Sequence, residues 1–285
     1  MAAGRGPRDH ERENPVTTVF ITGATSGLGR AVAHRLAAQG ADLILHGRDR
    51  ARLDAVAAQV GGAPVTVLAD LADPAQVRAL AADVLAATDR LDVFISNAGI
   101  GTAGPDRRVD AEGHELHFAV NHLAGFLLTQ QLLPLLRRSA PARIVSVASL
   151  SQSPLDFDDL MLEHGYSGAR AYGQSKLAQV MCGLELAGRL EPAEVTVNSL
   201  HPATLMPTNM LTDPRHQVDT LDTGVLATVR LATGGELTGV TGRFFDRQRE
   251  ARAHDQAYDP AARARLWARS EELVTPAAER VRPSR

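Results

Sequence analysis

The sequence predicts one α/β domain in which helices cover both faces of a doubly wound parallel sheet of about seven strands. Short apolar and β-branched runs alternate with longer segments whose apolar residues recur at helical spacing. Several of the short runs are apolar throughout, which is typical of strands covered on both faces. No change in composition divides the chain, so we expect one domain over 16–275 between tails at 1–15 and 276–285.

Glycines and capping residues mark the elements of the first third of the chain. Gly40 follows the first expected helix, and Gly61 and Gly62 follow the second, in the position where helices end. Asp73 and Pro74 begin the third helix, because a capping carboxylate followed by proline suits a first turn. The expected strands are 16–22, 41–46, 65–69 and 91–96, and the expected helices are 30–39, 50–60 and the one that begins at 73–74.

The same alternation continues to the end of the chain. Short apolar, β-branched runs are again separated by segments of helical periodicity, and Pro134 lies near the end of the longest of these. The expected strands are 142–148, 195–200 and 242–246, and the expected helices are 114–136, 169–190, 219–232 and 260–273.

Composition excludes several kinds of partner. A formal net charge of -3 and a pI near 6.4 argue against electrostatic capture of nucleic acid or an anionic membrane. The single cysteine, Cys182, excludes an internal disulfide and a cysteine metal cage, and it fits a reducing cytoplasm. Residues 1–15 lack the apolar core of a signal peptide, and no run of about 18 apolar residues follows. We expect a cytoplasmic protein with a small-molecule substrate, no metal and no membrane span.

Tyr172 and Lys176 form the candidate centre of the chemistry. They are four residues apart, so on a helix they share one face, roughly 6 Å apart along the axis. An ammonium beside a phenol favours the phenolate and lowers the tyrosine pKa from about 10. Such a tyrosine can exchange a proton with an alcohol or ketone oxygen. Alone, the pair also fits an ordinary amphipathic helix, so its meaning depends on the other motifs.

A glycine-rich turn, TGATSGLG at 22–29, separates the first expected strand from the first helix. Glycines allow the backbone to approach a ligand closely, and a helix N-terminus offers free N–H groups and a positive dipole. In the first strand–helix unit of an alternating chain, this pattern predicts a binding site for a pyrophosphate.

Further motifs accompany the turn and the tyrosine–lysine pair, in order along the chain: TGATSGLG at 22–29 is followed by NAG at 97–99, Asn121, a serine after the fifth strand and YGQSK at 172–176. Together these motifs resemble the short-chain dehydrogenase/reductase family, in its single-domain branch. The stretch between Ser149 and Tyr172 is long and contains DFDDL, and with the terminal RLWARSEEL it resembles retinol-dehydrogenase-type members. The resemblance implies a Rossmann fold and hydride transfer between a nicotinamide cofactor and a moderately apolar ketone, aldehyde or alcohol.

The resemblance also implies four catalytic roles. Tyr172 would be the acid/base, and Lys176 would bind the nicotinamide ribose and lower the Tyr172 pKa. Ser149 would hydrogen-bond the substrate oxygen, and Asn121 would hold a water in a proton relay. Ser146, Ser151 and Ser153 are alternatives to Ser149, which is favoured because it lies just beyond the strand, at the carboxyl edge of the sheet.

The remaining roles implied by the resemblance concern the cofactor. Asp70 would contact the adenine, although a simple turn carboxylate is the alternative, and Asn97 would contact the adenosine ribose. The segment HPATLMPT at 201–208 resembles the family's PG segment over the nicotinamide, with Ala203 in place of glycine. The full set of expected cofactor contacts is Gly23, Thr25, Ser26, Gly27, Leu28, Gly29, Arg48, Asp70, Leu71, Asn97, Ala98, Gly99, Tyr172, Lys176, Pro202, Leu205 and Thr208.

The dinucleotide is selected at the end of the second strand, LILHGRDR. A carboxylate there would accept both ribose hydroxyls of NAD, whereas a guanidinium would pair with the 2′-phosphate of NADP. Gly47 occupies the acidic position and Arg48 follows, so NADP is favoured and NAD is possible. Asp49 is the rival carboxylate, but it could equally cap the next helix.

Three further expectations remain. Residues 205–219 would form a mobile lid whose Met, Leu and Pro content suits an apolar substrate. A homo-oligomer is possible by resemblance. The alternatives to a reductase are a non-catalytic NAD(P)-binding sensor or interaction protein on the same fold, and a dehydratase or epimerase, which the glycine spacing disfavours.

Overall fold

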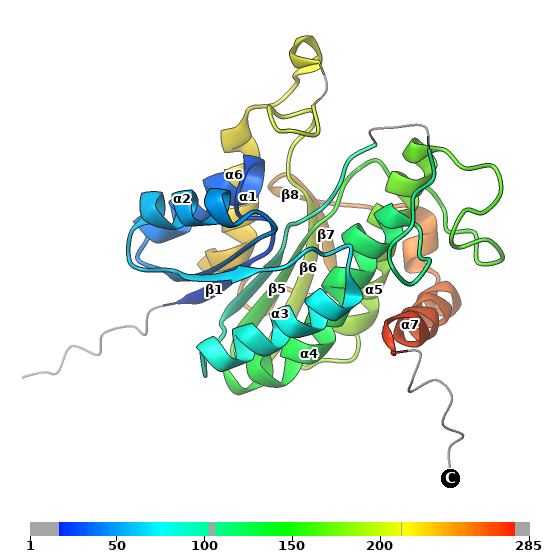
Figure 1. Ribbon diagram of the computed structural model, residues 1–285. Coiled ribbons are helices and arrows are strands. Elements are labelled where there is room, and N and C mark those ends of the chain that lie inside the picture. The colour runs from blue at the N-terminus through cyan, green and yellow to red at the C-terminus, as the bar shows by residue number, and fades with distance from the viewer. Residues whose placement is uncertain (1–16, 103–105, 212, 277–285) are drawn as a thin grey trace, which may run out of the picture.

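The computed structural model describes residues 17–102, 106–211 and 213–276. Within them, eight strands form one sheet in the order β3-β2-β1-β4-β5-β6-β7-β8 (Figure 1). Neighbouring strands are parallel except for β8, which runs antiparallel to β7. The strands are β1 (Thr18–Ile21), β2 (Asp42–Gly47), β3 (Val65–Leu68), β4 (Val93–Ser96), β5 (Ala142–Val147), β6 (Val195–His201), β7 (Arg243–Asp246) and β8 (Arg249–Ala251).

Helices cover both faces of this sheet, as the sequence predicts. In Figure 1, α1, α2 and α6 lie on one face and α3, α4 and α5 on the other, with α7 against α5. The helices are α1 (Gly27–Ala38), α2 (Arg50–Val60), α3 (Pro74–Ala87), η1 (Phe118–Leu123), α4 (Ala124–Arg138), α5 (Gly168–Ala187), α6 (Leu221–Thr233) and α7 (Pro260–Val274), with short turns η2 (Pro214–His216), η3 (Gly235–Leu237) and η4 (Asp255–Tyr258).

The predicted doubly wound parallel sheet is confirmed, with two local differences. The additional strand β8 is short and polar, so it carries no apolar pattern that a sequence could reveal. The helix expected at 114–136 starts later, because Glu115 pairs with Val109 in an isolated β-bridge. Its first part is the π-helical stretch η1. A π-turn widens the helix by one residue and is frequent at functional sites. Here it carries Asn121, whose side chain bonds Ile100 rather than facing solvent.

Part of the predicted organisation lies outside the described residues. This applies to the N-terminal tail at 1–15, to Val16 of the first expected strand and to most of the C-terminal tail at 276–285. In the part of the chain that is described, no helix combines the length and apolar character needed to cross a membrane.

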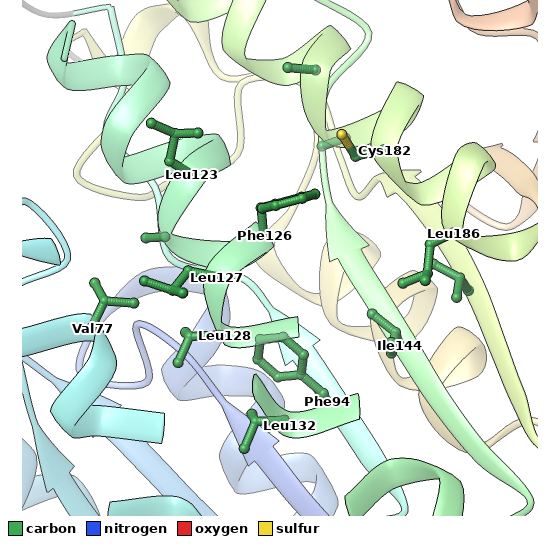
Figure 2. Packing of buried hydrophobic residues seen from close by; sticks show 14 of the residues in the cluster. Val77, Phe94, Leu123, Phe126, Leu127, Leu128, Leu132, Ile144, Cys182 and Leu186 are labelled. Carbon is green, nitrogen blue, oxygen red and sulfur yellow. The ribbon is translucent and has the colours of Figure 1, made fainter. Parts of the chain in front are cut away.

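Two apolar cores hold the layers together, one on each face of the sheet. Figure 2 shows the core beneath α4, where Leu128 and Leu132 lie near Phe94 of β4. The Phe94 ring stacks on Phe20 of β1 with centroids 5.2 Å apart. The strands β1 and β4 are therefore fixed side by side, at the point where the winding of the sheet reverses. Ligands of doubly wound proteins bind in the crevice at the carboxyl ends of these two strands.

Truncation of the stacked ring should test this core. We expect Phe94→Ala to lower the free energy of unfolding by about 3–5 kcal/mol, because a fully buried ring leaves a cavity. Urea unfolding followed by circular dichroism measures the change. Leu85→Ala, at a side chain of α3 that is 41% exposed, is the control and should cost far less. Equal losses in the two variants would contradict this placement of the core.

Candidate active site

The glycine-rich turn joins β1 to α1 and leaves the N-terminus of α1 without a side-chain cap. Ser26 occupies the N-cap position but makes no capping hydrogen bond. In contrast, Asp49, Asp73 and Asp259 cap α2, α3 and α7 through their carboxylates. Free N–H groups at the positive end of a helix dipole suit a phosphate anion. The residues of this turn therefore fit the pyrophosphate of a dinucleotide.

Two glycines of the turn are required by close contacts. A Cβ atom on Gly29 would lie 2.3 Å from the Gly23 carbonyl oxygen and 2.5 Å from Asn97 Nδ2, so only glycine lets α1 pack on the turn. Gly27 has a φ of +50°, and a Cβ there would lie 3.1 Å from Thr208 Cγ2. The 202–208 segment, which follows β6, thus lies beside the turn, as a shared cofactor site requires.

Asn97, at the end of β4, fastens the turn to the next strand. Its Nδ2 donates to the carbonyl oxygens of Thr22 (2.8 Å) and Gly23 (3.3 Å). The backbone N–H groups of Asn97 and Ala98 both donate to Thr22 Oγ1 at 3.0 Å. The predicted contacts of the NAG motif and of the glycine turn are therefore brought together. The Asn97 amide group itself is occupied in positioning the turn.

His46 is a positioning residue that the sequence-based reasoning missed. Its Nδ1 accepts a hydrogen bond from the Gly23 N–H (3.1 Å), and its Nε2 lies 3.1 Å from the Ala69 carbonyl oxygen. Nδ1 must therefore be unprotonated and Nε2 must carry the proton, which fixes a neutral imidazole. Burial lowers the His46 pKa to about 4. The available signal was a lone histidine in an apolar strand directly before the expected cofactor-selecting position.

The expected adenosine contacts lie at the ends of β2 and β3. Arg48 is exposed just beyond β2. The rival Asp49 accepts from the Arg52 N–H at 3.0 Å, so its carboxylate serves as the cap of α2. Asp70 accepts from the Ala72 N–H at 3.0 Å, which is the turn-carboxylate alternative, while Leu71 is buried beside it.

The catalytic candidates meet where α5 begins beside the end of β5. The Ser149 hydroxyl lies close enough to Tyr172 to lower the pKa of the phenol. The Lys176 ammonium nitrogen lies 5.7 Å from the centroid of the Tyr172 ring. Of the crowded serines, Ser149 thus influences the phenol, whereas Ser153 lies against Gly173, where a Cβ atom would come within 2.5 Å of its Oγ. Ser146 instead lines a small cavity under α4 and α5.

Lys176 is buried and hydrogen-bonded inside the site. Its Nζ donates to the Val147 carbonyl oxygen and to Gln179 Oε1, both at 2.9 Å. A Cβ atom on Gly99 would lie 3.4 Å from Nζ and 3.1 Å from Asn121 Oδ1, so these predicted residues also converge. Asn121 Oδ1 accepts from the Ile100 N–H at 2.7 Å. Lys176 is also the only lysine among the 30 Lys and Arg residues of the chain, a signal that the motif analysis overlooked.

The pKa of Tyr172 differs from the sequence-based expectation. The pair predicted a pKa lowered by Lys176, but burial raises it, and only the hydrogen bond with Ser149 acts in the opposite direction. Burial also lowers the Lys176 pKa to about 7, because an ammonium loses its hydration. Sequence spacing places the two groups together, but their burial depends on packing that spacing does not describe.

Arg247 joins the two ends of the 205–218 segment and was also missed. Its guanidinium donates to the Asp219 carboxylate and, at 3.0 Å, to Thr204 Oγ1. The Thr204 N–H donates to the same carboxylate at 2.6 Å. Leu205, the expected contact of the cofactor carboxamide, follows with a φ of +46°. The predicted lid over 205–219 thus has a fixed base, although residue 212 lies outside the described part of the chain.

Three histidines and a second tyrosine have partners of their own. Tyr166 donates to Glu115 at 3.4 Å, and His117 Nδ1 lies 2.9 Å from the same carboxylate. His114 pairs with Asp110 at 2.9 Å, and His122 with Ser270 at 2.8 Å. The described residues contain no group of His, Cys, Asp and Glu able to hold a metal ion.

Comparison with known proteins identifies the family of this chain. The family model described as short chain dehydrogenase matches residues 17–219. Human retinol dehydrogenase 14 is 39% identical over 292 residues, which cover 90% of this chain and 86% of the relative. The chain therefore belongs to the short-chain dehydrogenase/reductase family, NAD(P)-binding oxidoreductases, and is an enzyme of that family. Within the family it is retinol-dehydrogenase-like.

Solved structures agree with this membership. A protein from Mycobacterium paratuberculosis, described as uncharacterized, has a TM-score of 0.74 at 31% identity, covering 90% of this chain and 93% of that one. A 3-ketoacyl-(acyl-carrier-protein) reductase from Brucella melitensis, complexed with NADH, has a TM-score of 0.66 at 26% identity, covering 81% and 96%. A short chain dehydrogenase from Shigella flexneri, complexed with NADP, has a TM-score of 0.67 at 26% identity, covering 81% and 97%.

The His46 hydrogen bonds predict a pH dependence of stability. The unfolded histidine titrates near 6.5 and the folded one near 4, so between these values the unfolded state binds more protons. The His46 contribution to the free energy of unfolding should therefore fall by about 3 kcal/mol as the pH drops through this window, and His122, whose pKa burial lowers to about 3, adds a fall of its own. Unfolding curves of wild type and His46→Gln measure the contribution, which the variant should lack. His216→Gln, at an exposed histidine, should keep the wild-type pH dependence; the same dependence in His46→Gln would contradict the assignment.

Proposed function

We propose that this chain is an NADP(H)-dependent oxidoreductase that interconverts a moderately apolar alcohol and its ketone or aldehyde, with Tyr172 as acid/base. The observation that carries the proposal is the convergence of Ser149 and Lys176 on Tyr172 at the carboxyl edge of the sheet. Tyr172 offers a proton, Ser149 a second hydroxyl and Lys176 a positive charge. Reduction of a carbonyl group needs these three contributions.

The roles of the chain's own residues follow from this geometry. The cofactor, when bound, supplies or accepts the hydride. Tyr172 Oη gives its proton to the substrate oxygen during reduction, and Ser149 Oγ donates a second hydrogen bond to that oxygen. The charge of Lys176, which is 3% exposed, favours the phenolate left behind. Asn121 would hold the water of the proton relay beside Lys176.

The cofactor would lie along the carboxyl edge of the sheet. We assign its pyrophosphate to the turn from Gly23 to Gly29 and its adenosine to Arg48, Asp70 and Leu71. The 97–99 motif would contact the ribose, and Lys176 would contact the nicotinamide ribose. Pro202, Leu205 and Thr208 would contact the nicotinamide end. The uncapped α1 and the contact between Gly27 and Thr208 support this course.

An apolar substrate suits the segment that follows β6. Leu205, Met210 and Val218 of that segment are 49%, 47% and 64% exposed. Exposed apolar side chains at the rim of a site favour a ligand that is itself apolar. The name of the relative, retinol dehydrogenase 14, points to an alcohol of the same character. A homo-oligomer remains a prediction from the family.

Removal of the Tyr172 hydroxyl tests the reaction. We expect Tyr172→Phe to lower kcat/KM by about a thousand-fold, because general acid–base catalysis is lost. The assay is the loss of NADPH or NADH absorbance with a panel of ketones, quinones and aldehydes that includes retinaldehyde. Tyr166→Phe removes the same hydroxyl from a tyrosine that bonds Glu115, and should retain activity within a few-fold. Undiminished activity in Tyr172→Phe would sink the proposal.

Cofactor preference can be tested at Arg48. A charge-assisted hydrogen bond to a 2′-phosphate contributes about 1.5–3 kcal/mol, so Arg48→Ala should raise the KM for NADPH by about tenfold or more and that for NADH little. Asp49 favours this reading, because its carboxylate caps α2 instead of facing a ribose. Arg138→Ala, which removes an exposed arginine at the end of α4, is the matched control. Equal changes for the two cofactors in Arg48→Ala would count against NADP.

A further inference from the structure

Gln179 is the one side chain that bonds the catalytic ammonium in this structure. It lies one turn after Lys176 on α5, is buried, and accepts from Nζ through Oε1 at 2.9 Å. The second acceptor is the Val147 carbonyl oxygen, at the end of β5. The ammonium is therefore held between the sheet and its own helix.

The chemistry of the two groups fixes the orientation of the Gln179 amide. An ammonium can only donate, so it must face the amide oxygen rather than the NH₂ group. The NH₂ end is then free for the cavity of about 40 Å³ that Gln179 lines together with Ser96, Asn121 and Ser146. The cavity is also lined by apolar side chains, such as Phe126 and Trp267, and it has room for about two or three waters beside the amide.

We propose that Gln179 is a positioning residue of the reaction, whose amide oxygen fixes the Lys176 ammonium against β5 and keeps it charged beside Tyr172. The effect of Gln179 on catalysis rests on the proposed function. The placement of the ammonium rests on the hydrogen bonds alone.

The groups around Lys176 leave few alternatives for this role. Val147 faces it from β5, Gly99 from the segment after β4, Asn121 from η1, and Tyr172 and Gln179 from α5. Within the described chain, burial is the cause that shifts its pKa, and no carboxylate contributes. A hydrogen bond to the charged form opposes burial, so loss of the Gln179 oxygen should release the proton more readily.

The sequence permits a direct measurement, because Lys176 is the only lysine of the chain. The full chain, grown with lysine labelled with carbon-13 at Cε, gives one side-chain resonance whose pH titration reports this ammonium. We expect Gln179→Met, which keeps the side-chain volume, to lower the Lys176 pKa by about one unit. Gln179→Glu should raise it, because a carboxylate replaces the amide at the same position.

The matched control is Gln131→Met. It makes the same exchange at a half-buried glutamine of α4 whose amide oxygen has no hydrogen-bond partner among the described residues. This variant should titrate like wild type. Thermal unfolding of each variant shows whether it is folded, and Gln179→Glu keeps the test decisive if the methionine variant is not.

The catalytic consequence is read from the pH profile of kcat/KM. Its alkaline limb should move to lower pH in Gln179→Met and to higher pH in Gln179→Glu, a displacement that a merely structural role would not produce. An unchanged Lys176 titration in both variants would overturn the inference. So would a shifted titration with an unshifted profile. If Tyr172→Phe retains activity, the proposed function fails, and the lysine titration still decides on the contact with Gln179.

Discussion

A buried positive charge at the carboxyl end of β5 is the constraint on which the site depends. The Lys176 ammonium is 3% exposed, so carbonyl oxygens must replace its hydration. They come from Val147 of the sheet and from Gln179 of the same helix. Helix α5 must therefore pack closely against the sheet edge, and that packing also places Tyr172 next to Ser149.

The two ends of the candidate site are held by different kinds of interaction. At the turn, neutral groups do the positioning: the His46 imidazole and the Asn97 amide both bind the backbone around Gly23. Near Tyr172, the group held in position is the charged Lys176 ammonium. Because the imidazole and the amide carry no net charge, the positive end of α1 is the main electrostatic feature that faces an anion at the turn. In the proposed reaction, by contrast, the charge of Lys176 itself takes part.

The sheet and most of the candidate site could be predicted from the sequence, because they depend on patterns within short segments. Alternating periodicity gave the parallel sheet, and glycine spacing, NAG and the tyrosine–lysine pair identified segments that the fold does bring together. What escaped depends on partners distant in sequence. Arg247 bonds Thr204, and His46 bonds Gly23 and Ala69, across different elements. The raised Tyr172 pKa escaped for the same reason, since burial is a property of the packed chain.

The single lysine has a consequence beyond chemistry at the site. Every other basic side chain of the Lys/Arg type is an arginine, and the one primary amine among the side chains is buried. The only side-chain amine of the Lys type that an acylating reagent could modify is thus shielded from solvent in the folded chain.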